Sequence, residues 1–147
     1  DRREIIRDPK RKIIMKNLIF ILLLCLPTLS FTQQYIDDSN FDDKISEKSA
    51  FGDDESTIVV IEFWASFNEA NAFPDWDKIK GAKYYRVDLA KAPKAKKEYR
   101  VRMAPTLIIF KDGINEESFK AGLDLECPVT LEELQDAIEE VKKAGQF

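Results

Sequence analysis

The residues of this chain with the clearest capacity for chemistry are two cysteines, Cys25 and Cys127, which lie far apart in the sequence. Dithiol–disulfide exchange uses a CxxC pair, in which one thiolate attacks and the second thiol resolves the mixed disulfide. Two cysteines also cannot supply the four ligands of a structural zinc site. The chain has no histidine, which removes the commonest general base and the commonest metal ligand. We therefore expect neither a metal site nor a cofactor.

Cys25 lies in an apolar run that predicts a secretory signal peptide. A polar, positive start at 15–17 precedes the apolar residues 18–26, and small residues at both ends of 30–32 fit a cleavage point before Gln33. The apolar run is short, because a transmembrane helix needs roughly 20 apolar residues. The pattern predicts an exported protein of the bacterial periplasm or cell envelope, with no stable membrane span after cleavage of the signal.

Three parts of the chain follow from this pattern. Residues 1–14 have mixed charge and no initiator methionine. One interpretation is an over-extended gene start with translation at Met15, and the alternative is a piece of a longer chain. We expect residues 1–14 to be a non-native extension, residues 15–32 to be the signal peptide, and residues 33–147 to form the folded domain.

The charge of residues 33–147 limits the partners of this domain. This segment carries 16 basic and 24 acidic side chains, so its net charge is −8. Such a domain is repelled by phosphate backbones, and we expect a protein or peptide partner and no nucleic acid. Six cations between Lys91 and Arg102 depart from this balance. They are interpreted as a solvated helix face or as a docking surface for an acidic partner.

Hydrophobic patterns and turn signals predict alternating strands and helices. The expected strands are 34–36, 57–64, 84–88, 106–111 and about 115–121. The expected helices are 40–48 with Ser39 as cap, Asn68 to about Lys80 with a break at Pro74, 93–99, and a last one that the capping box Thr130–Glu133 opens. Alternation favours parallel strands, and the turn at Asp112–Gly113 makes the last two strands antiparallel.

Three pieces of this sequence resemble the thioredoxin family. They are Ile-Glu-Phe-Trp-Ala-Ser-Phe at 61–67, Met-Ala-Pro-Thr at 103–106, and the closing hairpin with Lys-Asp-Gly at 111–113 and Ala-Gly at 121–122. The resemblance covers about residues 34–143. It implies an α/β thioredoxin fold, with a central mixed sheet, an antiparallel C-terminal hairpin and helices on both faces.

The same resemblance implies a degenerate active site. It puts Asn68 and Asn71 where the family has its two cysteines, and Glu62 where the family has a buried acid. Tyr84 takes the position where a lysine often accompanies that acid. Carboxamides can neither attack nor resolve a disulfide, so no dithiol exchange is expected.

Two interpretations of the asparagines remain open. Asn is a preferred N-cap, so Asn68 is expected to bond the free amides of the helix that it starts. Glu69 then suits the positive end of the helix dipole. The alternative is a specific contact of Asn68 and Asn71 with a ligand.

The resemblance also implies a peptide groove, lined by five residues. These are Trp64, Phe67, Ala104, Pro105 and Gly122. Phe67 is expected to be exposed, whereas Trp64 is interpreted either as groove lining or as core packing. A cis bond is expected between Ala104 and Pro105, which leaves the backbone N–H and C=O of Ala104 free to pair with an extended peptide.

Two functions compete on this basis. The first is an exported, redox-inactive, thioredoxin-like domain that binds peptide segments or a partner protein through that groove. The second is a monothiol oxidoreductase that uses Cys127. Cys127 follows the last strand and is expected near the groove, where Asp124 and Glu126 are expected to raise the pKa of its thiol.

Overall fold

The computed structural model describes residues 32–48 and 56–145. The expected extension, Cys25 and all but the last residue of the expected signal peptide lie outside the described residues. Among the residues that are described, no helix is long and apolar enough to cross a membrane.

Five strands form one mixed sheet in the order β1-β3-β2-β4-β5. They are β1 (Tyr35–Ile36), β2 (Ile58–Trp64), β3 (Lys83–Asp88), β4 (Thr106–Lys111) and β5 (Ile114–Lys120). Strand β3 is parallel to β1 and β2, while β4 is antiparallel to β2 and β5. The β-branched and aromatic runs place β2 and β4 at the centre, where both faces of the sheet are buried. The predicted α/β mixed sheet with an antiparallel C-terminal hairpin is confirmed.

The turn between β4 and β5 follows from its two residues. Asp112 and Gly113 have φ angles of 51° and 82°, the left-handed values that a two-residue hairpin turn requires. The Asp112 carboxylate accepts a hydrogen bond from the Thr57 amide at 3.0 Å, and Thr57 O accepts one from the Asp112 amide at 3.0 Å. The hairpin is thereby fastened to the start of β2.

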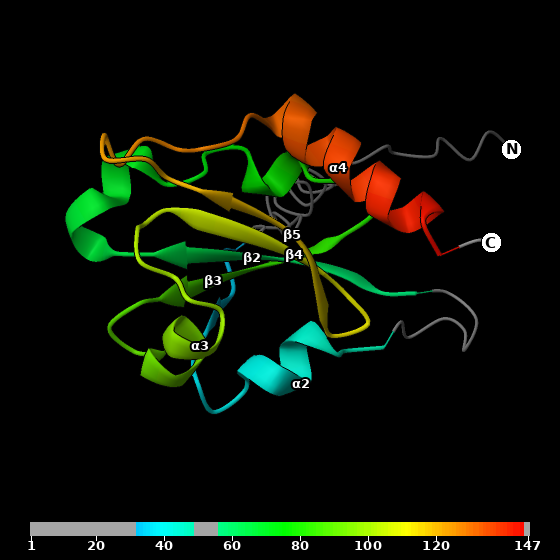
Figure 1. Cartoon of the computed structure of the whole chain (residues 1–147), viewed down its shortest axis with the longest axis horizontal. Helices are drawn as coiled ribbons and strands as arrows, with labels where there is room; N and C mark the ends of the chain where they lie inside the picture. Colours follow the sequence, from blue (N-terminus) through cyan, green and yellow to red (C-terminus); the bar gives the residue numbers. More distant parts are fainter. Residues whose placement is uncertain (1–31, 49–55, 146–147) are drawn as a thin grey trace, which may run out of the picture. The chain divides into compact units, whose positions relative to one another are not determined.

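Alternate residues of β2 face two separate apolar clusters. Val59, Ile61 and Phe63 face α2 (Phe41–Ile45) and α3 (Pro93–Glu98), whereas Ile58 and Val60 face α4 (Leu131–Lys143). Figure 1 shows α4 on one side of the sheet and α2 and α3 on the other. The expected helices on both faces are therefore present. Glu62 has the same parity as Ile58 and Val60, so it lies on the α4 side.

Helix α4 begins as the sequence predicts. Thr130 Oγ1 accepts a hydrogen bond from the Glu133 amide, and the Glu133 carboxylate accepts one from the Thr130 amide at 2.9 Å. Leu134, Ile138 and Val141 are buried against the sheet. Each such side chain contributes roughly 1.5–3 kcal/mol of transfer free energy to the fold.

The predicted cap of the first helix is wrong. Helix α2 is Phe41–Ile45, its N-cap is Asn40, and Asn40 makes no side-chain cap bond. Ser39 instead donates its amide and its hydroxyl to the Asp37 carboxylate, because that acceptor lies two residues away.

The helix predicted from Asn68 to about Lys80 is not an α-helix, although the predicted break at Pro74 is confirmed. Two short 3-10 helices occupy this stretch, η1 (Ser66–Asn71) and η2 (Trp76–Lys78). Two features prevent an α-helix. Asn68 has the non-helical angles φ −121° and ψ 30°, and the amide of Phe73 donates to Glu62 rather than to a preceding carbonyl.

Helix α3 is held from both of its ends. The Asp38 carboxylate accepts hydrogen bonds from the amides of Lys94 and Ala95, at 2.8 and 2.9 Å, which replaces a local N-cap. After the helix, Tyr99 packs edge-on against Phe110 with ring centroids 5.1 Å apart, and Val101 is buried. The backbone that carries the charged residues of α3 and of the segment after it is therefore fixed to the rest of the domain.

Candidate functional site

Asn68 joins three loops at one end of the sheet. Its Nδ2 donates to Ala104 O and to Leu125 O, both at 2.8 Å, and its Oδ1 accepts from Asn71 Nδ2 at 2.7 Å. The residue is only 9% exposed. Both Nδ2 hydrogens are therefore used inside the domain, and Asn68 acts as a cross-link between η1, the loop before β4 that contains Ala104, and the loop after β5.

The prediction that Asn68 caps a helix is wrong. The N-cap of η1 is Ala65, and no side chain caps this helix. The Asn68 side chain bonds carbonyls that are 36 and 57 residues away, instead of the amides of its own helix. Glu69 lies 3.9 Å from Arg86 Nη1 and points to a cation rather than to a helix end.

The prediction of a cis Ala104–Pro105 bond is confirmed. The accompanying expectation for the Ala104 backbone is wrong in one respect. Its carbonyl is not free, because Asn68 donates to it at 2.8 Å, and the residue is only 3% exposed.

A pocket of about 360 Å³ lies against this cross-link. Of the five residues predicted to line a groove, Phe67 and Ala104 line the pocket, together with Leu125. Phe67 is 77% exposed, which confirms that prediction. An exposed aromatic ring beside a concave surface is the kind of feature that marks binding sites.

The other three residues predicted for the groove are not among the residues that line this pocket. Trp64 is partly buried, packs edge-on against Tyr35 at 6.0 Å and lies under the Arg86 guanidinium, so core packing describes it best. Pro105 is buried. Gly122 is exposed and accepts a hydrogen bond from the Leu125 amide at 3.1 Å, so it shapes the turn rather than the pocket wall.

Leu125 adopts a backbone conformation that is unusual for its residue type. Its φ is 59°, in the left-handed region that favours glycine. The bond from Asn68 to Leu125 O stabilises this conformation. Glycine would adopt this conformation without strain, so the leucine is strained at a position that lines the pocket.

In the sheet, Glu62 and Arg86 form a buried ion pair. Arg86 Nε and Nη2 are both 3.1 Å from Glu62 Oε2, and the two residues are direct partners across β2 and β3. Glu62 is 0% exposed and Arg86 2%. Tyr84 Oη donates to Oε2 and the Phe73 amide donates to Oε1, both at 2.6 Å.

This network explains what Glu62 can do. Burial raises the pKa of Glu62, while the hydrogen bonds from Tyr84 and Phe73 and the charge of Arg86 oppose that rise. Burial and the nearby carboxylate raise the pKa of Tyr84, so its phenol remains a donor. Both carboxylate oxygens are occupied and out of contact with solvent. Glu62 therefore holds strands together and does not reach a substrate.

Sequence reasoning predicted Glu62 and Tyr84 but missed Arg86. The available signal was a charged residue in the middle of a strand of apolar and aromatic residues. A charge at such a position needs an opposite charge on a neighbouring strand, and Glu62 in β2 is the matching residue.

Cys127 lies outside this pocket. It is partly buried against the apolar cluster under α4, and its Sγ donates to Val129 O at 3.5 Å. Burial raises the pKa of the thiol, and the Glu62 charge adds to the rise. The predicted direction is confirmed, but the causes are burial and Glu62 rather than Asp124 and Glu126. In the described part of the chain, no group of residues could hold a metal ion.

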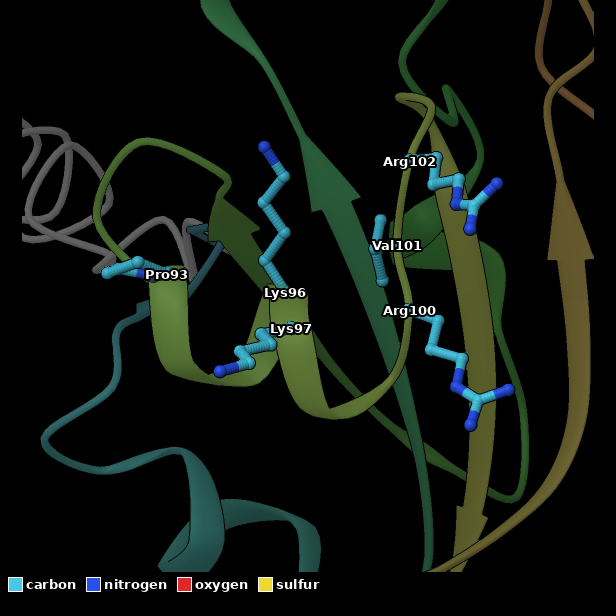
Figure 2. A pocket seen from close by; sticks show the side chains of 6 residues that line it. All are labelled: Pro93, Lys96, Lys97, Arg100, Val101 and Arg102. Atoms are coloured by element: carbon cyan, nitrogen blue, oxygen red, sulfur yellow. The ribbon is translucent and has the colours of Figure 1, made fainter.

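A second pocket, of about 320 Å³, adjoins the first. Its charged lining consists of Lys96, Lys97, Arg100 and Arg102, and Lys96 and Arg102 also line the first pocket. Figure 2 shows Lys96 and Lys97 projecting from α3, and Arg100 and Arg102 extending to one side of the segment that follows it.

Comparison with protein families identifies the thioredoxin family. The model of the thioredoxin family matches residues 32–140, which is most of the chain. A search of curated proteins found no match.

Solved structures with a similar fold include three chains of low sequence identity. A single-residue mutant of thioredoxin from Halobacterium salinarum is 20% identical, with a TM-score of 0.57, over 75% of this chain and 90% of that one. Plasmodium falciparum thioredoxin is 15% identical, with a TM-score of 0.55, over 73% and 97%. A designed protein is 18% identical, with a TM-score of 0.56, over 75% and 97%.

Proposed function

The chain belongs to the thioredoxin family, and from this premise we propose that it is a redox-inactive member that binds a peptide segment or a partner protein. Binding takes place at the pocket beside Phe67. The predicted signal peptide at 15–32 adds the proposal that the protein works outside the cytoplasm.

The observation that carries this proposal is the Asn68 cross-link. Asn68 and Asn71 stand where the resemblance puts the family's two thiols, and their amide groups bond each other at 2.7 Å. Neither side chain can become a nucleophile. The surface beside them is nevertheless kept in shape, with Phe67 exposed and Leu125 held in a strained conformation. This surface has a defined shape although the two asparagines beside it cannot exchange disulfides. Its shape therefore supports a role in binding.

The contacts also suggest how binding occurs. Ala104 O already accepts from Asn68, so a peptide gains little by pairing with that carbonyl. The exposed ring of Phe67 and the side chain of Leu125 are available instead. Recognition therefore depends mainly on apolar side-chain contacts rather than on the addition of a strand.

One experiment tests binding. An unstructured peptide mixture is titrated into the isotope-labelled protein, and amide shifts are followed by NMR. We expect shifts at Phe67, Ala104 and Leu125 that are lost in Phe67→Ser. The matched control is Ile114→Ser, which removes another exposed apolar side chain on β5. Shifts that survive Phe67→Ser, or that Ile114→Ser removes equally, contradict the proposed site.

A second experiment tests redox inactivity. In the dithiothreitol-driven reduction of insulin, we expect no rate above the uncatalysed one. Catalysis that survives Cys127→Ser would overturn the proposal, whereas catalysis that Cys127→Ser abolishes would establish the monothiol alternative. The buried position and raised pKa of Cys127 weigh against that alternative.

A further inference from the structure

The segment from Lys91 to Arg102 has a charge opposite to that of the rest of the domain. It carries six basic residues and one acidic residue, whereas the rest of 33–147 carries 10 basic and 23 acidic residues. All six cations are exposed. Lys94 bonds Asp42 at 3.2 Å, and in residues 32–48 and 56–145 the other five make no ion pair. A concentrated positive surface thus lies on an acidic domain.

Arg100 is held in a backbone conformation that suits glycine. Its φ is 52°, and its amide and that of Val101 close the end of α3 by donating to Lys97 O and Lys96 O at 3.2 and 2.9 Å. Glycine is the usual residue at this helix-ending position. An arginine is strained at this position, where a glycine would not be, which makes its guanidinium a candidate for ligand binding.

Strained backbone positions lie at both pockets. Among the described residues, three non-glycine residues have positive φ, and one of them, Asp112, forms the hairpin turn. The other two are Arg100, which lines the cationic pocket, and Leu125, which lines the apolar one. Because Lys96 and Arg102 line both pockets, the two form one continuous surface with an apolar end and a cationic end.

We propose that this continuous surface binds an extended acidic peptide segment, whose apolar side chain lies beside Phe67 and Leu125 and whose carboxylates contact Lys96, Lys97, Arg100 and Arg102. This proposal rests on the proposed function and names the chemistry of its ligand. The cationic end has a planar guanidinium at each of two positions, Arg100 and Arg102, and guanidinium groups bind carboxylates in a bidentate manner.

The structure favours a peptide over a nucleic acid or a membrane. The net charge of −8 on residues 33–147 repels an extended polyanion wherever it leaves the basic segment. A short acidic segment avoids this cost because it covers only the two pockets. The apolar end around Phe67 also needs an apolar side chain next to the anions, which a phosphate backbone lacks. Asp88, in the lining of the apolar pocket, disfavours a second carboxylate at that end.

The test uses fluorescence anisotropy and short labelled peptides in which a run of glutamates flanks a Leu-Phe pair. Replacing the glutamates by glutamines is expected to weaken binding about tenfold at low salt, and added salt removes the difference. Replacing the Leu-Phe pair by serines is expected to weaken binding by a similar factor.

Variants of the protein identify the residues that bind the glutamates of the peptide. Lys97→Gln combined with Arg102→Gln is expected to weaken binding of the glutamate peptide about tenfold, without changing binding of the glutamine peptide. The matched control is Lys80→Gln with Lys142→Gln, which removes the same charge elsewhere and changes binding less than about twofold. Arg100→Gly relieves the strain, so weaker binding together with undiminished stability separates ligand binding from folding.

The outcomes distinguish the two proposals. If the glutamate and glutamine peptides bind equally and Phe67→Ser abolishes both, the acidic ligand is wrong and the proposed function stands. If no peptide shows binding that depends on Phe67, the proposed function itself is wrong. If an oligonucleotide or an anionic lipid vesicle binds as tightly as the glutamate peptide, the proposal of a peptide ligand is wrong. The surface then binds anions in general.

Discussion

The buried pair Glu62–Arg86 and the basic segment from Lys91 to Arg102 carry charge in opposite ways. In the buried pair each charge is compensated, because Glu62 accepts from Arg86, Tyr84 and the Phe73 amide. In the basic segment, within the described part of the chain, Lys94 alone forms an ion pair. The first arrangement satisfies the fold, and the second leaves charges available to a ligand.

The difference shows how to tell structural charge from functional charge in this domain. Burying an uncompensated charge is so costly that the fold must provide its partners, and a charge with all its partners has little capacity left for a ligand. An exposed cation costs almost nothing and needs no partner. A strained backbone at the same residue, as at Arg100, indicates that an exposed cation has a function. Four changes test this distinction and the Asn68 cross-link, from the largest expected effect to the smallest.

Arg86→Ala is expected to lower the free energy of unfolding by about 3–5 kcal/mol, because Glu62 is left buried without its cation. Urea unfolding followed by circular dichroism measures this. Replacing both partners, as Glu62→Leu with Arg86→Met, should recover most of the loss. A loss below about 1 kcal/mol in Arg86→Ala would mean that the pair is not structural, and the comparison would fail.

Asn68→Asp is expected to lower the free energy of unfolding by about 1–3 kcal/mol. The carboxylate has nearly the same shape but cannot donate to the carbonyls of Ala104 and Leu125. Asn71→Ala, which removes a single donor to Asn68, is the control and is expected to cost less than about 1 kcal/mol. Thermal unfolding compares them, and equal losses would contradict the cross-link.

Arg100→Gly is expected to raise the free energy of unfolding by up to about 1 kcal/mol, since a left-handed backbone costs an L-residue about 1–2 kcal/mol and the freedom of glycine in the unfolded chain returns part of that. The control is Arg102→Gly, whose φ is not positive, so only the destabilising contribution remains. Urea midpoints give the sign of each change. Destabilisation by Arg100→Gly would show that the arginine supports the fold after all.

Lys97→Gln is expected to change the free energy of unfolding by less than about 0.5 kcal/mol, because the side chain is exposed and has no ion-pair partner in residues 32–48 and 56–145. The same urea titration measures it. A loss greater than about 1 kcal/mol would place this lysine with the structural charges.

The elements that could be predicted from the sequence depend on local signals. β-branched runs gave the central strands, Asp112–Gly113 gave the hairpin, and Thr130 with Glu133 gave the start of α4. The exposure of Phe67 and the cis bond before Pro105 followed from the resemblance to thioredoxin.

The remaining features depend on contacts between distant residues. The conformation of η1 is fixed by hydrogen bonds from Asn68 to residues 36 and 57 positions away. Residue preferences for helix caps depend on nearby residues only, so they cannot predict such bonds. Arg86 lies 24 residues from Glu62 and becomes its partner only through the register of β2 and β3. The continuous surface formed by the two pockets likewise depends on α3 and the loop after β5 lying near each other.

The outer strands of the sheet have a consequence for self-association. Within the described residues, β1 has two residues, and β5 presents Glu116 and Lys120 to solvent. The pairing of β4 with β5 also shifts register between Ile109 and Phe110, and such bulges increase the local twist. Growing amyloid fibrils need a long, flat, apolar edge as a template. This sheet presents no such template in the described residues, so concentrated folded protein should resist fibril growth.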